Sequence, residues 1–297
     1  MTGDSGAGWL LTGDADDFLA RAGAYLRADP ALHTVTLSVT ASLRESGLAA
    51  YGARHQLFGV LYGPDGRVDG TFLWTEPFRL NISPLDRVQA DALAVALQGR
   101  EPSGVFGPDD AAAAFADAWR ARTGAGVRRA IEQRLFRLDE FTPPEPAPAG
   151  RPRVATTADL ELVTRWRDDF DAELGTFVGG SQSWADERIS YGGITFWESA
   201  DGTPLSLAGV TRESAGAVRV GPVYTPQDLR GRGYGGAVTA EVSQAALAAG
   251  AREVLLFTDL ANPTSNALYQ RIGYRPVRDF DVYAFTDPSH PPTSESS

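Results

Sequence analysis

The stretch "LRGRGYGGAV", residues 229–238, decides how this chain is interpreted. It contains four glycines and two arginines, and it leads into an alanine-rich segment that is expected to be helical. Three interpretations follow: the pyrophosphate loop of a nicotinamide cofactor, a site for another phosphate-bearing molecule, or a flexible turn. The neighbouring sequence separates them.

The nicotinamide interpretation rests on Gly231, Gly233 and Gly236, which match the pattern G-x-G-x-x-G. That fingerprint requires the glycines to follow a strand of a parallel sheet directly, and an acidic residue to end the next strand about 20 positions later. Here the predicted strand ends near Thr225 and "PQDLR" intervenes, whereas Glu253 begins a strand. The surroundings therefore disfavour a dinucleotide site.

A phosphate site explains the glycines better than a plain turn does. Glycine is unfavourable in the first turn of a helix unless the backbone must be left bare, yet Gly233, Gly235 and Gly236 stand at or inside the predicted helix start. Bare N–H groups at a helix N-terminus bind anions, because the helix dipole adds to their partial charge. Arg230 and Arg232 supply further positive charge in an otherwise acidic chain.

The composition is that of an ordinary globular protein, and it excludes several kinds of site. A chain of 297 residues predicts two domains. The absence of cysteine rules out disulfides, thiolate metal sites and a cysteine nucleophile, and only three histidines are present, so no metal is expected. The formal net charge of -11 disfavours nucleic-acid binding, which leaves small molecules or cationic groups as the expected partners.

The N-terminus gives no targeting signal. Residues 1–8 lack a basic start followed by an apolar run, and no segment of the chain approaches the length of apolar sequence that a membrane span needs. We therefore expect a cytoplasmic protein with no membrane contact.

A proline-rich segment separates two halves of similar outline. Residues 142–152, "TPPEPAPAGRP", are typical of an interdomain linker, and the polar tail at 287–297 is expected to be disordered. Residues 13–141 and 153–286 both mix antiparallel hairpins with strand–helix–strand crossovers. This pattern predicts an α+β or mixed α/β fold rather than a run of repeated βαβ units.

The second half resembles the GNAT superfamily of N-acetyltransferases. "RGRGYG", residues 230–235, fits the family's central motif, and "NPTSNALYQRIGY", residues 262–274, is similar to its next motif, in which an Asn precedes a Leu-Tyr pair and a Gly-aromatic ending. The resemblance covers about residues 153–285. It implies two GNAT-like domains, each a central mixed, mostly antiparallel twisted sheet flanked by helices, with 153–286 as the catalytic one.

The resemblance also implies that acetyl-CoA, or another short acyl-CoA, is a co-substrate. Backbone groups of Val223, Tyr224 and Thr225 would pair with its pantetheine arm, and one of their amides would polarise the thioester carbonyl. Asn262 would hydrogen-bond the coenzyme, and Tyr269 would protonate the leaving thiolate as general acid, unless that ring only packs in the core. The pyrophosphate would be held by Arg230, Gly231, Arg232, Gly233, Tyr234, Gly235 and Gly236.

The sequence does not identify the general base. Carboxylates stand only at strand ends, at Glu198, Glu253 and Asp259, where each could equally be solvated, and proton removal could pass through water. The acceptor side is expected at the helix in 164–175, whose acidic residues either attract a cationic amine or form a solvated face. Residues 179–184, "GGSQSW", are expected to form a flexible loop over the site.

The first half lacks the residues that carry this chemistry. Where the glycine loop should lie, residues 81–93 hold no glycine and place Asp86 near a helix start, where its charge would oppose a phosphate. "FADAWRARTGAGV", residues 115–127, matches residues 265–277 loosely, which suggests an internal duplication, and it sets Trp119 against Tyr269. At the same offset Ala112 matches Asn262. We predict a degenerate domain that does not bind acetyl-CoA and instead supports the active half.

We therefore expect an N-acetyltransferase that moves an acetyl group to a primary amine, on a small molecule or a peptide, by direct attack in a ternary complex. Two alternatives stay open. A non-catalytic acyl-CoA sensor is favoured by the missing base and disfavoured by Tyr269, and a nicotinamide oxidoreductase is the other. Neither the acceptor, the acyl-chain preference nor the oligomeric state follows from the sequence.

Overall fold

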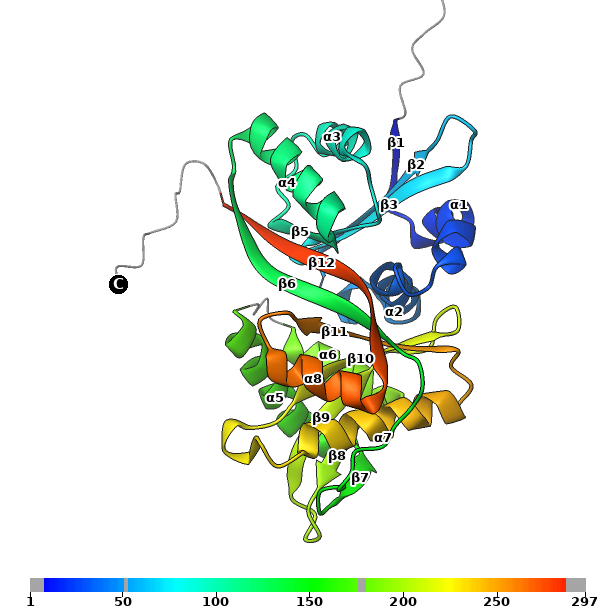
Figure 1. Cartoon of the computed structure of the whole chain (residues 1–297). Helices are drawn as coiled ribbons and strands as arrows, with labels where there is room; N and C mark the ends of the chain where they lie inside the picture. The colour runs from blue at the N-terminus through cyan, green and yellow to red at the C-terminus, as the bar shows by residue number, and fades with distance from the viewer. Residues whose placement is uncertain (1–7, 51–52, 176–179, 287–297) are drawn as a thin grey trace, which may run out of the picture. The chain divides into compact units, whose positions relative to one another are not determined.

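The computed structural model describes residues 8–50, 53–175 and 180–286 (Figure 1). It divides into two compact units. Unit 1 comprises Met1–Thr36, Ala53–Gln133 and Arg278–Ser297, and unit 2 comprises Leu37–Gly52 and Arg134–Val277. None of the described helices has the length and apolar character needed to cross a membrane. The predicted disordered tail, 287–297, lies outside the described residues.

Unit 1 is a mixed sheet with three helices. Its helices are α1 (Ala15–Ala28), α3 (Arg87–Ala96) and α4 (Asp109–Thr123). Its own strands are β1 (Trp9–Thr12), β2 (His55–Tyr62), β3 (Val68–Glu76), β4 (Leu80–Ile82) and β5 (Gly104–Pro108), and it shares β6 (Gly126–Leu138) and β12 (Tyr274–Thr286) with unit 2. The strand order in this unit is β1-β2-β3-β4-β5-β12-β6, in which β4 and β5 are parallel.

Unit 2 has the same kind of sheet. Its helices are α2 (Thr34–Ala50), α5 (Leu160–Leu174), α6 (Ser181–Ser190), α7 (Tyr234–Ala248) and α8 (Pro263–Ile272). Its own strands are β7 (Arg151–Val154), β8 (Ile194–Glu198), β9 (Pro204–Val210), β10 (Ala217–Tyr224) and β11 (Glu253–Asp259). The order is β6-β11-β10-β9-β8-β7, and β10 and β11 are parallel. The predicted mixed α/β, mostly antiparallel architecture is confirmed.

The unit boundaries fall at other positions than the predicted domain boundaries. The chain changes units inside α2, β6 and β12, so the proline-rich residues 142–152 lie within unit 2. Residues 278–286, expected in the second domain, belong to unit 1, and residues 37–50, expected in the first, belong to unit 2. The assignment of catalysis to the second half of the chain stays a prediction.

The two units repeat one order of elements. In unit 1 the parallel strands β4 and β5 are joined through α3, and α4 leads from β5 into β6. In unit 2 β10 and β11 are joined through α7, and α8 leads from β11 into β12. Figure 1 shows the two closing strands, β6 in green and β12 in red, side by side. A parallel pair with a crossover helix is therefore present in both units.

The sheet of unit 2 is buried on both faces. Neighbouring residues of β9 point to opposite faces, so Leu207 and Ala208 belong to different cores. The core on the α5 and α6 side includes Trp166, Phe196 and Tyr224. The core on the α7 and α8 side consists mainly of aliphatic residues and the tyrosines of α8 and β12: Val220, Val238, Val242, Val254, Leu256, Tyr269, Ile272 and Tyr274.

Candidate functional site

The parallel strands β10 and β11 of unit 2 separate halfway along their length. Their paired residues run from Ala217 opposite Glu253 to Val220 opposite Leu256, and then the pairing ends. On its other side β10 resumes its pairing with β9 after an irregularity, with Val223 opposite Ala208. Past Val220, β10 therefore has an edge that is not paired with β11, and this part of the sheet is open. Backbone groups on such an edge need a partner, which a ligand can supply.

The glycine loop lies directly beyond this opening. Gly231 and Gly233 have φ of 76° and 85°, a region that other residues rarely adopt, and Gly233 precedes α7 without any side-chain cap. The first amide of the helix with an internal partner is that of Ala237, which donates to the Gly233 carbonyl at 3.0 Å. The preceding amides of the first turn have no intrahelical acceptor, as at any helix N-terminus. They form a set of donors suited to an anion.

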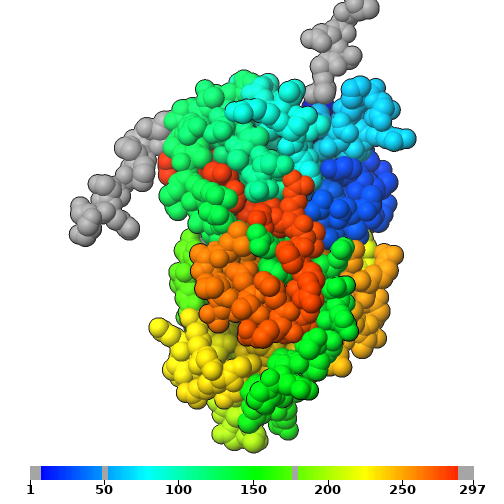
Figure 2. Space-filling model, in the orientation of Figure 1, coloured from blue at the N-terminus to red at the C-terminus, as the bar shows by residue number. Residues whose placement is uncertain are grey.

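Gly235 and Gly236 have a second reason to be glycine. A Cβ at Gly235 would lie 3.3 Å from Thr225 Oγ1, and one at Gly236 would lie 2.7 Å from Leu268 Cδ1 of α8. The helix start therefore packs closely on the end of β10 and on α8. In Figure 2 the loop residues, in yellow, lie at the surface of unit 2, where a ligand can reach them.

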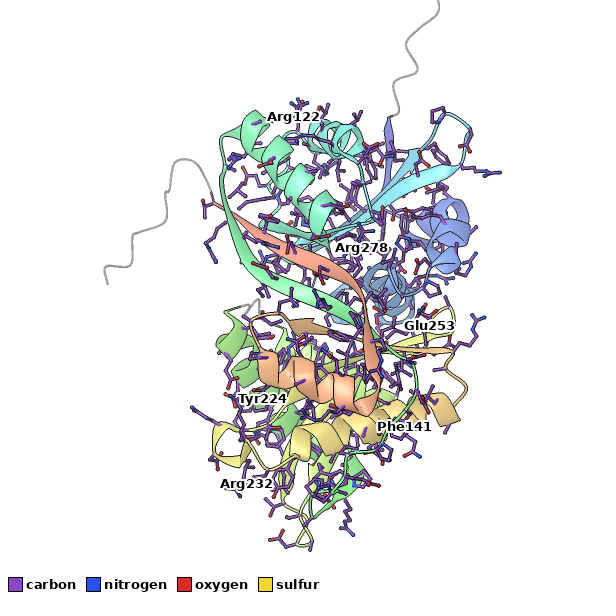
Figure 3. The ribbon with its side chains drawn as sticks, in the orientation of Figure 1. Arg122, Phe141, Tyr224, Arg232, Glu253 and Arg278 are labelled. Carbon is purple, nitrogen blue, oxygen red and sulfur yellow. The ribbon has the colours of Figure 1, made fainter. Side chains whose placement is uncertain are left out.

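The two loop arginines have different surroundings. Arg230 donates from Nε to the Thr225 carbonyl at 2.8 Å and from Nη2 to both carboxylate oxygens of Glu173 in α5, at 2.6 and 2.7 Å. Arg232 is exposed, contacts the Asp228 carbonyl at 3.1 Å, and lies at the outer edge of the loop (Figure 3). Arg232 therefore forms no ion pair with any described residue, whereas the charge of Arg230 is offset by a carboxylate.

Side chains fix the end of β10. Ser206 donates from Oγ to the Tyr224 carbonyl at 2.9 Å and lies at the same distance from Thr225 Oγ1. The Tyr224 ring is buried against Trp166, 5.8 Å between centroids. Burial raises the pKa of its hydroxyl, and the nearby Asp169 carboxylate raises it further. Of the three predicted pantetheine contacts, Tyr224 and Thr225 have carbonyls that already accept side-chain hydrogen bonds.

The second motif begins α8 at the open end of β11. Asn262 caps the helix, because its Oδ1 accepts from the Ser265 amide at 3.0 Å. Asn266 ties the helix to the strand by donating to the carbonyls of Asp259 at 2.8 Å and Asn262 at 2.7 Å. Asn262 is exposed, and its amide nitrogen has no partner among the described residues, so it is available to a ligand.

Tyr269 lies further along α8 than Asn262, near the C-terminal end of the helix. It is 8% exposed, and its ring meets Tyr274 edge-on at 6.1 Å. Burial raises the pKa of its hydroxyl to about 12. The described residues offer this hydroxyl no hydrogen bond. The ring therefore packs in the core, as the simpler interpretation holds, while the hydroxyl stays protonated and unpaired.

The three candidate bases lie in different places. Glu198 is 2% exposed and held by Arg153 at 2.7 Å and Arg151 at 2.9 Å, and the hydrogen bonds from Arg153 lower its pKa. Glu253 pairs with the first residue of β10, and Figure 3 shows it across unit 2 from Tyr224. Only Asp259 stands at the open end of the strands, with Oδ1 accepting from the Ala261 amide at 2.8 Å.

The acidic run of α5 is divided among separate partners. Asp171 is buried and paired with Arg167 at 2.7 Å, Glu173 binds Arg230, and Asp169 lies beside Tyr224. The run is therefore neither a uniform solvated face nor a single amine site. The expected loop at 179–184 is wrong from Ser181 onward, because α6 begins there, and Gly179 lies outside the described residues.

Helix α6 creates a cluster that the sequence does not predict. Arg188 of α6 donates to the Tyr191 hydroxyl at 2.6 Å, and the guanidinium of Arg212 lies 4.0 Å above the Tyr191 ring. Because the sequence predicts a loop at the start of α6, no sequence signal places Arg188, Tyr191 and Arg212 together.

The corresponding position in unit 1 is chemically different. Asp86 accepts from the Gln89 amide at 2.8 Å, and Gln89 accepts from the Asp86 amide at 2.9 Å, so the start of α3 is closed by its own side chains. An adjoining cavity of about 380 Å³ is lined by the carboxylates of Asp86, Asp110 and Asp117 and by one cation, Arg87. Carboxylates therefore outnumber cations where a phosphate site would need donors.

Comparisons with known proteins agree with this geometry. The family model described as FR47-like protein matches residues 203–282. A GNAT-family acetyltransferase from Colwellia psychrerythraea is 10% identical with a TM-score of 0.56, covering 93% of this chain and 98% of that chain. A tandem GNAT protein from the clavulanic acid biosynthesis pathway is 14% identical with a TM-score of 0.56, covering 96% and 100%. A Drosophila protein is 12% identical with a TM-score of 0.66, covering 95% and 100%.

The comparison with curated proteins gave no match. At the identities of the solved structures, the likeness shows the fold. Together with the FR47-like match, it confirms the predicted resemblance to the GNAT superfamily.

Proposed function

We propose that this chain, which has the GNAT fold, is an N-acetyltransferase that transfers the acyl group of acetyl-CoA to a primary amine. The reaction is a direct attack of the amine on the thioester in a ternary complex. Unit 2 binds both substrates, and unit 1 is a supporting unit that does not bind the coenzyme. The acceptor amine belongs to a small molecule or a peptide.

The observation that carries the proposal is the junction of β10, the glycine loop and α7. The strand edge past Val220 lacks its parallel partner, and the uncapped start of α7 follows at Gly233. An extended arm that ends in a diphosphate fits this order of groups, with the arm along the strand and the diphosphate on the helix amides. Unit 1 has the same elements, but Asp86 occupies the helix start.

The residues of this junction can hold the coenzyme without a conformational rearrangement of the helix. The amides from Gly231 to Gly236 and the exposed Arg232 suit the diphosphate, and Asn262 can add a hydrogen bond from its free amide nitrogen. Val223, Tyr224 and Thr225 supply the strand edge. An amide near the strand irregularity would polarise the thioester carbonyl and support the oxyanion that forms there.

Tyr269 is the proposed general acid. Its raised pKa keeps the hydroxyl protonated throughout the neutral range, and none of the described residues accepts a hydrogen bond from it. A phenol is a weaker acid than a thiol, so the transfer depends on close positioning beside the departing sulfur. Proton removal from the amine is assigned to water. Of the three candidate carboxylates, Asp259 stands at the end of β11 where its pairing with β10 has ended, so it is the one proposed to receive the proton.

The alternative is an acyl-CoA sensor without turnover, and the lack of a carboxylate on the open strand edge favours it. A nicotinamide oxidoreductase is the weaker alternative, because "PQDLR" and the short helical turn Gln227–Leu229 separate the strand from the glycines. It predicts NADH binding, which calorimetry measures directly.

Calorimetry with acetyl-CoA on Gly233→Ala tests the coenzyme site. Alanine is strained at the φ of 85° that Gly233 adopts, so the loop must shift and affinity should fall at least tenfold. Gly202→Ala is the matched control, because Gly202 has φ of 86° in the β8–β9 turn, away from the loop. Equal affinity in both variants contradicts the proposed diphosphate site on this loop. Thiol release across a panel of amines then separates the transferase from the sensor.

A further inference from the structure

Arg212 carries a guanidinium that lies over an aromatic ring and whose outer edge has no acceptor among the described residues. Its central carbon lies 4.0 Å from the centre of the Tyr191 ring. That ring is fixed in turn, because the Tyr191 hydroxyl donates to the Val210 carbonyl at 2.8 Å and accepts from Arg188 Nη1 at 2.6 Å. Stacking on an aromatic face restricts the guanidinium to one plane.

The inner edge of the same guanidinium faces two carboxylates. Nε of Arg212 lies 3.0 Å from Glu45 Oε2 of α2 and 3.5 Å from Glu187 Oε1 of α6, without the alignment of a hydrogen bond. The terminal nitrogens Nη1 and Nη2 have no acceptor among the described residues. Arg212 is 28% exposed at its side chain, so these nitrogens remain accessible. The side chain thus presents a free two-nitrogen fork.

In the chain topology, Arg212 follows the end of β9 that pairs with β10 just before the free strand edge. The loop, the free strand edge and the strand irregularity follow one another from Gly231 back to Val220, and Val220 pairs with Val210 of β9. Arg212 follows Val210 by two residues, which is roughly 7 Å of extended chain. The contacts with Tyr191 and Glu187 put it on the side of the sheet that α6 covers.

We infer that Arg212 binds a carboxylate of the acceptor, so that the acceptor class is an amine that also carries a carboxylate. This inference rests on the proposed function. An arginine fork matches a planar carboxylate with two parallel N–H···O bonds, and stacking on Tyr191 holds the fork ready for that geometry. Glu45 and Glu187 lower the local positive charge, which favours a singly charged carboxylate over a doubly charged phosphate.

The cluster also shows what Arg188 contributes. Its Nη1 is used by the Tyr191 hydroxyl and the Val210 carbonyl, and its side chain is only 13% exposed. Arg188 is therefore a positioning residue that holds Tyr191 under Arg212. The acceptor-binding role falls to Arg212.

The test is binding of ω-amino acids, from glycine to 5-aminopentanoate, compared with alkylamines of the same chain length. Calorimetry on the full chain saturated with coenzyme A should show at least tenfold tighter binding of the amino acid at the best length. Arg212→Gln should remove this preference and leave the Kd of coenzyme A unchanged. Arg212→Lys, which keeps the charge without the fork, should retain only part of it.

Arg21→Gln is the matched control, since Arg21 pairs with Asp17 on α1 of unit 1 and should leave the preference intact. An equal affinity for amino acids and alkylamines, or a preference that survives in Arg212→Gln, overturns the inference. Thiol release distinguishes it from the proposed function. Turnover without a carboxylate preference leaves the transferase and removes the Arg212 site, whereas preferential binding without turnover on any amine leaves the site and removes the transferase.

Discussion

Glu173 at the end of α5 binds Arg230 of the glycine loop through both carboxylate oxygens, at 2.6 and 2.7 Å from Nη2. Both side chains are nearly half exposed, so the pair adds little to stability. Its effect is local, because it offsets the charge of an arginine beside the proposed diphosphate site. A residue that the sequence placed on an acidic helix face therefore contacts the glycine loop.

We predict that Glu173→Gln tightens acetyl-CoA binding about two- to fivefold, the range of a solvent-exposed charge pair. The freed guanidinium of Arg230 can then turn to the phosphates. Calorimetry at low and high salt measures the effect, which should shrink as salt screens the charges. Asp17→Asn, which removes the helical pair with Arg21, is the control. Weaker binding in Glu173→Gln contradicts this account.

Tyr269→Phe tests the proposed general acid. The substitution removes a hydroxyl that makes no hydrogen bond with any described residue, so the fold and the Kd of acetyl-CoA should be unchanged. If the hydroxyl protonates the thiolate, kcat should fall about a hundredfold or more, the usual contribution of a general acid. Steady-state kinetics with the best amine gives kcat, and circular dichroism confirms the fold.

The pH profile adds a second readout for Tyr269. Its pKa is raised to about 12, so the wild type should keep the acid in its active form up to about pH 11. An alkaline fall of kcat centred near pH 10 would mean that another, exposed group supplies the proton. If kcat of Tyr269→Phe falls at the same alkaline pH as kcat of the wild type, the group that titrates is likewise not Tyr269.

The sequence predicted the parts of the fold that local signals define. The spacing of glycines and apolar residues predicts the glycine loop, the start of α7 and the strand that precedes it. The second motif, from Asn262 to Gly273, predicts α8. The mixed sheet and the repeated order of elements were also accessible, because strand and helix periods alternate in the same order in both halves.

Helix α2 was not predicted, and its composition explains why. "TVTLSVT" at its start is rich in β-branched residues, which favour strands, and tertiary burial of residues such as Leu37 and Leu43 holds it helical. At the start of α6 the sequence predicts a loop, because Gly179 and Gly180 precede the helix. These two misses removed Glu45, Glu187 and the Tyr191 cluster from the predicted site.

The long-range pairs of the site have no sequence signature. Arg230 and Glu173 are far apart in the chain, and only the packing of α5 beside the end of β10 brings them together. The same holds for Arg212, which lies in a short connection that carries no motif. Motifs predicted the proposed coenzyme side of the site, whereas the proposed acceptor side consists of residues that only tertiary contacts bring together.

Asp86→Ala separates the roles of the two units. Loss of the capping box at α3 should lower the free energy of unfolding by about 1 kcal/mol. Because unit 1 is proposed not to bind the coenzyme, the Kd of acetyl-CoA should not change. Urea denaturation and calorimetry measure the two quantities. A second acetyl-CoA per chain in the wild type, lost or altered in the variant, would show that unit 1 binds coenzyme as well.

Asp159 gives a prediction for acid stability. Its carboxylate accepts from Arg153 Nη1 and Nη2 at 2.8 and 2.9 Å, and these hydrogen bonds lower its pKa from 3.8 to about 2. A lowered native pKa contributes stability above pH 3.8, and the contribution is lost as the pH falls towards 2. Asp159→Asn should therefore cost about 1–2 kcal/mol at pH 7, and the cost should shrink below pH 4.

Urea denaturation of Asp159→Asn and the wild type at pH 7, 5, 4 and 3 measures this difference. Asp65→Asn is the control, because the ion pair of Asp65 with the Arg67 guanidinium is loose, at 3.6 Å, and its hydrogen bond from the Arg67 amide, at 2.9 Å, lies in an exposed turn. A cost that stays constant down to pH 3 would contradict the charge of Asp159 as the source of the loss, because the hydrogen bonds from Arg153 and from the Thr156 amide both lower the pKa of this carboxylate. Because Arg153 also binds Glu198 on β8, a pH-dependent cost would show that this charge cluster secures the edge strand β7.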